Sequence, residues 1–212
     1  MYSLWLRDEL FLVGHDEAGK PVVHEASLGA GLAGAMLMDL VFAGRLRVSH
    51  QRVGVVDRRP TGDAAGDSVV DALACGVAPT GVRAMIGWLG QDAYERSAAT
   101  LIAAGLLRKA VSRRLGLVPV TRYQVVDEPV VIRVRARLRA VVHGRELPDA
   151  PTAALGALIR VVRVDSQLYS SLPSGEVLSR LDTIAGGLDL GLRQIIGAVD
   201  GLVAANALSA FR

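Results

Sequence analysis

The sequence predicts a mainly α-helical protein that folds as a single compact domain over residues 1–212, with short β-hairpins of which one protrudes. Ala, Val and Leu carry most of the 51% hydrophobic content while aromatic residues supply only 4%, and Ala and Leu are strong helix formers. Most apolar segments follow a helical period, and only two short stretches look extended. A chain of 212 residues with this composition can bury a complete core.

The first elements are helices. Ser3 caps an amphipathic helix that is predicted to end near Gly14, and residues 16–20 form a turn. Residues 28–43 are apolar on nearly every side and stop at Gly44, which predicts a buried central helix.

A hairpin and three helices follow. Residues 45–48 and 53–56 are extended and apolar on either side of a polar turn, which predicts a β-hairpin. Pro60-Thr61-Gly62-Asp63 is a loop, and Asp63 is best explained as a helix cap or turn residue rather than a site residue. The next helices are predicted through residues 69–73, 81–89 and 92–104.

The second half begins with a hairpin over residues 107–123 that has an exposed, apolar tip. A basic amphipathic helix follows, because five apolar residues fall on one arc of a helical wheel: Val131, Val134, Leu138, Val141 and Val142. Arg133 and Arg137 flank this arc on one side, and Arg135 and Arg139 on the other. Helices at 152–163, 175–184 and 188–208 are predicted to complete the domain.

Positive charge is concentrated between Arg108 and Arg139. This stretch contains nine basic and two acidic residues, although the net charge of the whole chain is only +3. Charge of this density beside apolar side chains suits an anionic membrane or a phosphate-rich polymer. The hairpin residues Arg113, Arg114, Leu115, Leu117 and Val118 are candidates for contact with a membrane or another copy of the chain. For the four arginines of the helix, packing of their stems over neighbouring residues is the favoured explanation, and membrane contact is the alternative.

Several classes of function are not expected. Cys75 is the only cysteine, so no internal disulfide can form. We expect no signal peptide and no uninterrupted apolar stretch of about 18 residues, hence a cytoplasmic protein with at most peripheral membrane contact. The histidines are scattered and no nucleophile or carboxylate motif stands out, so we expect no metal, no cofactor and no enzyme.

The sequence contains one match to a dinucleotide-binding motif. Gly29, Gly31 and Gly34 match G-x-G-x-x-G, and Asp57 follows where a ribose-binding acid could stand. The polar segment before Gly29 does not resemble a buried strand, so close packing of a helix is the better explanation.

Four blocks resemble the Golgi phosphoprotein 3 family in order and spacing, and the likeness covers nearly the whole chain. They are residues 4–12 (LWLRDELFL), 31–40 (GLAGAMLMDL), 43–46 (AGRL) and 60–63 (PTGD), continued by 94–96 (YER) and 105–107 (GLL). Nearly all basic residues are Arg, as in GC-rich bacterial genomes, so we expect a bacterial member.

The resemblance implies a helical domain with a protruding hairpin that serves self-association and membrane contact. In eukaryotic members it also implies binding to phosphatidylinositol 4-phosphate and to glycosyltransferase tails. The headgroup positions of the family correspond here to His24, Ala33, Gln91 and Tyr94, with Arg96 beside them. Because no cation stands at the three positions where the family has arginine, we expect altered or weakened headgroup specificity, and general attraction to anionic phospholipid instead.

Two alternatives belong to other classes. Residues 92–123 also resemble the end of a winged helix-turn-helix, although the helix offers few polar groups to base edges beyond Gln91, Tyr94 and Arg96, so nucleic acid is an unlikely partner. The other alternative is an adaptor that binds an unknown client and no lipid, which is less favoured than peripheral membrane binding. The client, the headgroup and the oligomeric state are not defined by the sequence.

Overall fold

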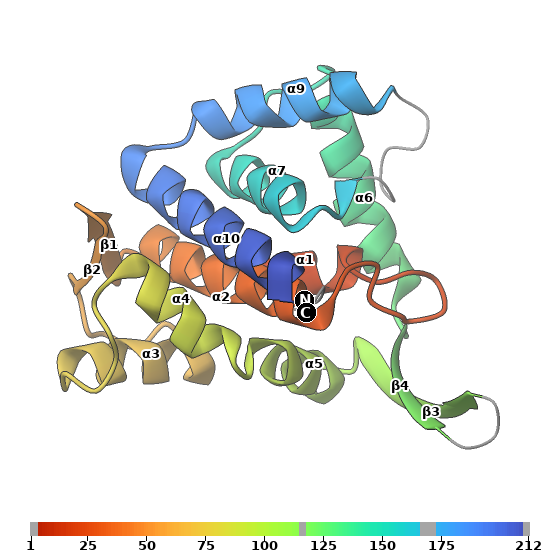
Figure 1. Cartoon of the computed structure of the whole chain (residues 1–212), viewed down its shortest axis with the longest axis horizontal. Helices are drawn as coiled ribbons and strands as arrows, with labels where there is room; N and C mark the ends of the chain where they lie inside the picture. The colour runs from red at the N-terminus through yellow and green to blue at the C-terminus, as the bar shows by residue number, and fades with distance from the viewer. Residues whose placement is uncertain (1–3, 115–117, 166–172, 210–212) are drawn as a thin grey trace.

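The predicted helices surround a central one. The computed structural model describes residues 4–114, 118–165 and 173–209, with the backbone alone at 112–114, 118–120, 174 and 209. Helix α2 (Glu25–Phe42) runs through the middle, with α7 and α10 on one side and α4 and α5 on the other (Figure 1). The bounds of the other helices are α1 Leu6–Val13, α3 Ala64–Ala74, α4 Val82–Gly90, α5 Ala93–Ala103, α6 Glu128–Val142, α7 Ala150–Val162, α9 Ser174–Gly186 and α10 Leu190–Ser209.

The strands form two separate antiparallel hairpins at opposite ends of the described structure (Figure 1). One pairs β1 (Leu46–Ser49) with β2 (Arg52–Val55), and the other pairs β3 (Leu107–Arg114) with β4 (Val118–Val125). Both were predicted, and the mainly α-helical fold class with short hairpins is therefore confirmed.

Helix α2 is buried from Ser27 to Leu40, as predicted, but it begins at Glu25 with His24 as its N-cap rather than at residue 28. By length and composition this helix could cross a bilayer, although Glu25 and Asp39 interrupt its apolar sequence, so the expectation of no uninterrupted apolar stretch of about 18 residues is not contradicted. However, 78% of the apolar window is buried inside the fold, so its hydrophobicity is explained by its place in the core.

The glycines of α2 allow two neighbouring helices to approach closely. A Cβ atom at Gly31 would lie 2.5 Å from Val162 Cγ2 of α7, and one at Gly34 would lie 2.5 Å from Val199 Cγ2 of α10. Both glycines lie inside a helix and not in a strand-to-helix turn, so the G-x-G-x-x-G match does not mark a dinucleotide-binding turn. The explanation by close helix packing is confirmed.

We expect Gly34→Val to lower the free energy of unfolding by about 1–3 kcal/mol, because the branched side chain must displace Val199 in a fully packed core. The matched control is Gly197→Val on the exposed side of α10, where a Cβ would meet no atom within 4 Å. Urea denaturation of both variants tests this, and equal losses at the two sites would contradict it.

Helix α1 differs from the prediction of an amphipathic helix capped by Ser3. Ser3 lies outside the described residues, the N-cap is Trp5, and every residue of the helix is buried, including Arg7, Asp8 and Glu9. The sequence pattern predicted that these charged residues are exposed. It could not show their partners, because these come from distant parts of the chain.

Those partners form a buried ion cluster, which we define as Arg7, Asp8, Asp39 and Asp63. The guanidinium of Arg7 lies 2.8 Å from an Asp63 oxygen, 3.5 Å from Asp39 and 4.0 Å from Asp8. Asp39 also accepts the Leu6 backbone N–H at 2.8 Å, and Asp63 caps α3 by accepting the Gly66 N–H at 2.8 Å. The capping role predicted for Asp63 is confirmed. Three of the sequence blocks quoted above thus meet at this cluster.

Candidate functional site

Hairpin β3–β4 projects from the helical body at the lower right of Figure 1. Its base is anchored, because Leu107 is 4% exposed and Tyr123 only 3%, and the Tyr123 N–H donates to the Gly19 carbonyl at 2.9 Å. Away from the base the described side chains are exposed or half-buried, and Val111 is 65% exposed. The hairpin is therefore held at one end and extends away from the core.

This hairpin carries positive charge only. Between Leu107 and Val125 there are five basic residues and no acidic one. Arg113, Arg114 and Val118 belong to the strands by their backbone, while Leu115 and Leu117 lie outside the described residues. Arg108 pairs with Gln124 and Arg122 pairs with Ala110 across the two strands. Because residues two apart in a strand point to the same face, Arg108 and Arg122 lie on one face of the hairpin.

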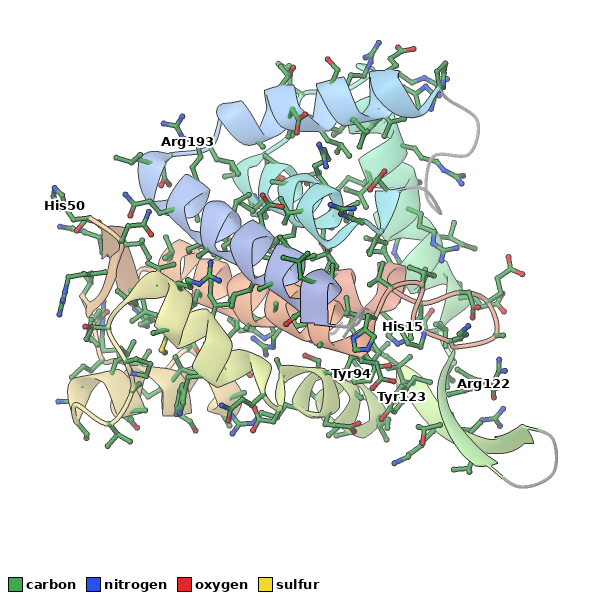
Figure 2. The ribbon with its side chains drawn as sticks, viewed as in Figure 1. His15, His50, Tyr94, Arg122, Tyr123 and Arg193 are labelled. Atoms are coloured by element: carbon green, nitrogen blue, oxygen red, sulfur yellow. The ribbon has the colours of Figure 1, made fainter. Side chains whose placement is uncertain are left out.

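An aromatic cluster fixes the base of the hairpin. It consists of Phe11, His15, Tyr94 and Tyr123, and Figure 2 shows the last three side by side. The His15 ring stacks on Phe11 with 4.3 Å between ring centroids, and the Tyr123 hydroxyl donates to Glu95 at 3.0 Å. Packing of these rings holds β4 against α1 and α5.

His15 is neutral in this cluster. Burial lowers the pKa of its imidazole, against smaller opposing effects of the Phe11 carbonyl and Asp16. Nδ1 lies 2.7 Å from the Phe11 carbonyl and must donate to it, so Nε2 accepts from the Tyr94 hydroxyl at 2.8 Å. The sequence analysis missed this cluster, and the signal that could have found part of it is the i, i+4 spacing of Phe11 and His15 at a helix end.

The basic helix α6 has the predicted apolar face, with Val131, Val134, Leu138, Val141 and Val142 buried. Its arginines are used largely within the fold. Arg137 forms an ion pair with Glu9, and Arg135 donates to the His15 carbonyl at 3.3 Å. Arg139 also has a partner, whereas Arg133 is exposed. Among the described side chains, Arg108 and Lys109 of the hairpin are exposed, while Arg122 is half-buried and donates to the Ala18 carbonyl at 3.5 Å.

The family-matched headgroup positions do not assemble a cationic pocket. His24 is exposed and accepts the Ala26 N–H at 3.2 Å, while Ala33 is 1% exposed and faces the core. Gln91 is exposed at the end of α4, and the Tyr94 hydroxyl is bound to His15. Arg96 pairs with Asp92 at 2.7 Å.

The surroundings of these positions are partly acidic. Burial raises the pKa of both Tyr94 and Tyr123; Glu25 adds to the shift at Tyr94, and at Tyr123 the hydrogen-bonded Glu95 adds more than Glu25 does. Glu95 accepts the Tyr123 hydroxyl in the same region. A phosphate would meet carboxylates here where the family pattern has arginines, which disfavours tight binding of a monophosphate headgroup.

A cleft of about 510 Å³ opens where the hairpin base meets α1 and α6. Arg108 and Arg135 line it together with Asp16, Glu17 and Glu128. Because three carboxylates accompany two guanidinium groups, the cleft is not an anion pocket.

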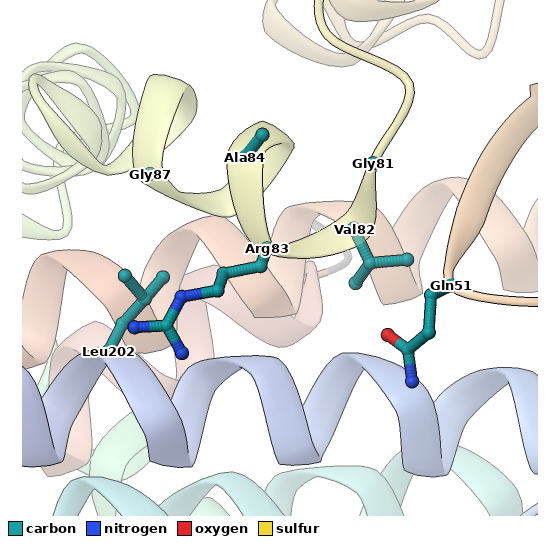
Figure 3. Close-up of a pocket in the computed structure, with 7 residues that line it drawn as sticks. All are labelled: Gln51, Gly81, Val82, Arg83, Ala84, Gly87 and Leu202. Atoms are coloured by element: carbon teal, nitrogen blue, oxygen red, sulfur yellow. The ribbon is translucent and has the colours of Figure 1, made fainter.

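A second groove, of about 620 Å³, lies between α4 and α10 (Figure 3). Small residues of α4, Gly81, Ala84 and Gly87, form one wall, and Arg83 extends toward α10, where it donates to the Gly201 carbonyl at 3.4 Å. None of the site residues predicted from the sequence lines this groove.

Comparison with known protein families supports the family resemblance of the sequence blocks that meet in the buried ion cluster. The model of the Golgi phosphoprotein 3 (GPP34) family matches residues 6–200. The chain belongs to this family. A search among curated proteins finds no match. Within this GPP34 protein, no group of three or more His, Cys, Asp or Glu residues in the described part of the chain is placed to hold a metal ion.

Proposed function

We propose that this protein binds anionic membranes peripherally, through hairpin β3–β4. The observation that carries the proposal is a projecting ribbon with five basic residues and no acidic one. Each basic residue near an anionic surface contributes about 1 kcal/mol, so the hairpin alone can supply several kcal/mol.

The apolar residues of the hairpin support the same proposal. Its sequence continues through Leu115, Leu117 and Val118, which suit the boundary between headgroups and acyl chains. A two-stranded hairpin is marginally stable by itself, so a projecting one gains from contact with another surface. Self-association through residues 107–123 would satisfy the same need and is the alternative for its apolar tip.

In this proposal the protein binds anionic phospholipids in general and has no preference for phosphatidylinositol 4-phosphate. The three positions where the family has arginine hold Ala33, Gln91 and Tyr94, and the next residue, Glu95, is acidic. We further propose that the protein acts as an adaptor for an unidentified client on the inner face of the cell membrane, and that it is not an enzyme.

Nucleic acid fits the structure less well. The exposed residues of α5 include Glu95, Ala99 and Ala103, and its Arg96 is already paired with Asp92. A recognition helix needs side chains that donate to or accept from base edges, and this surface offers few.

Co-sedimentation with vesicles of phosphatidylglycerol and phosphatidylcholine tests the proposal. We expect Arg113→Gln/Arg114→Gln to weaken binding by about 30-fold, because two charges of about 1 kcal/mol each are lost. The matched control is Arg58→Gln/Arg193→Gln at the opposite end of the molecule, where Figure 2 labels Arg193. This control should bind like the wild type.

Three results would count against membrane docking. They are no pelleting with anionic vesicles at moderate salt, equal loss in both double variants, or a shift of labelled duplex DNA without pelleting. Adding vesicles that contain phosphatidylinositol 4-phosphate at equal total charge tests the headgroup, and we expect no preference for them.

A further inference from the structure

The exposed face of hairpin β1–β2 combines arginine, serine and glycine. Strand register places Arg47 opposite Gly54, and Ser49 opposite Arg52. All four are exposed, whereas Leu46, Val48 and Val53 on the other face are buried. We call these four residues the β1–β2 face.

Gly54 has no explanation within its own chain. The strand pairing runs through it without a bulge, and its φ is not in the left-handed region that favours glycine. A Cβ atom there would meet no atom within 4 Å, so packing does not exclude a side chain. Glycine weakens a strand, and one recognised reason for a glycine there is the close approach of a ligand or another backbone.

A hollow of about 420 Å³ lies over this glycine. Arg47, Ser49 and Arg52 line it together with residues 53–56. Arg52 is oriented by its bond to the Thr80 hydroxyl at 2.8 Å. Within the described part of the chain, neither Arg47 nor Arg52 is paired with a carboxylate. The nearby acid Asp57 is occupied by Arg45 and Arg59, at 2.7 and 2.8 Å.

The supporting turn is held in a fixed shape. His50 and Gln51 have φ values of 50° and 59°, and the Gln51 N–H donates to Gln194 of α10 at 3.0 Å. The Val53 N–H donates to the Thr80 carbonyl at 2.7 Å, so the outer edge of β2 is also tied down. The two arginines therefore project from a rigid platform.

We propose that the β1–β2 face binds the phosphate group of a phosphorylated ligand. Two guanidinium groups supply charge-assisted donors, the Ser49 hydroxyl adds another, and Gly54 lets the phosphate oxygens approach the backbone. The face lies at the end of the molecule opposite hairpin β3–β4 (Figure 1), so this site is separate from the proposed membrane contact.

The test is titration of the full chain with glycerol 3-phosphate at constant ionic strength, followed by backbone amide NMR shifts. We expect saturable shifts centred on residues 47–54. Gly54→Val fills the hollow without changing charge, and Arg47→Gln removes one donor group. Each variant should raise the dissociation constant by about tenfold or more, because each removes or blocks a hydrogen bond to the charged phosphate group, and the loss of one such bond has an effect of this size.

Gly54→Val should remain folded, because valine favours strands and its Cβ meets no atom of the chain. The charge control is Arg58→Gln, a neighbouring arginine with 61% exposure outside the face, and it should bind as the wild type does. Non-saturable shifts in the wild type, wild-type affinity in Gly54→Val, or equal weakening by Arg58→Gln would each overturn the proposal.

The source of the phosphate is found by comparing glycerol 3-phosphate with vesicles that contain phosphatidic acid. If Arg47→Gln weakens only the soluble interaction, the ligand is a free phosphate ester. If it also weakens vesicle binding, the phosphate is a lipid headgroup. Arg113→Gln/Arg114→Gln should leave the glycerol 3-phosphate titration unchanged, so the two proposals can fail separately.

Discussion

Arg7→Met is expected to destabilise the protein by about 3–5 kcal/mol, the cost of leaving buried charges without their partner. Arg7 is 2% exposed and is the cation of the buried ion cluster, where it faces Asp8, Asp39 and Asp63. Methionine has a similar length and no charge, so the loss reports the electrostatic role of the guanidinium and little change in volume. Urea denaturation followed by far-UV circular dichroism measures it.

The control for Arg7→Met is Arg96→Met, which removes an exposed i, i+4 pair with Asp92 and should cost no more than about 0.5 kcal/mol. Asp39→Asn introduced into Arg7→Met should restore part of the stability, because one fewer carboxylate is left unpaired. A loss below about 1 kcal/mol in Arg7→Met, or no recovery in the double variant, would show that the cluster does not hold α1, α2 and the loop before α3 together.

The sequence predicted elements whose signal is local. The buried face of α6 follows from the spacing of Val131, Val134 and Leu138, and the burial of α2 follows from its uniformly apolar composition. Both hairpins were marked by short extended runs around turns. In each case the residues that decide the structure stand close together in the chain.

The buried ion cluster and the aromatic cluster could not be predicted in this way. Arg7 is separated by 32 residues from Asp39, and His15 by 79 from Tyr94. A helical wheel assigns charged residues such as Arg7 to solvent, because it contains no information on partners from other elements. For α6 the sequence favoured packing of the arginine stems over neighbouring residues, but it could not identify His15 and Glu9 as the partners of Arg135 and Arg137.

The family resemblance located the headgroup positions in the sequence, and the structure explains why they do not form a cationic site. Ala33 lies in the interior of α2, and the Tyr94 hydroxyl is used by His15. Exposed positive charge on the described residues includes that of hairpin β3–β4 and that of the β1–β2 face, which lie at opposite ends of the molecule. The proposed membrane contact and the proposed phosphate site are therefore spatially separate.

Asp39→Asn is expected to abolish much of the pH dependence of stability between about pH 4 and pH 7. Burial raises the pKa of Asp39 from 3.8 to about 7, against the lowering effects of the Leu6 N–H and the Arg7 charge. In that window the folded protein holds a proton that the unfolded chain has released, so the free energy of unfolding falls as pH rises. Three pKa units correspond to roughly 4 kcal/mol as an order of magnitude.

Asparagine resembles the protonated carboxyl group, since its amide oxygen can still accept the Leu6 N–H. We therefore expect Asp39→Asn to match the wild type near pH 4 and to become progressively more stable than it toward pH 7. Taking the difference between the two proteins at each pH removes the contributions of Glu9, whose pKa is also raised, and of His15, whose pKa is lowered. Asp71→Asn, at a carboxylate with 70% exposure, should leave the wild-type pH profile unchanged. If Asp39→Asn is instead less stable than the wild type by a constant amount at every pH, Asp39 is ionised throughout, and Arg7 stabilises three carboxylates at once.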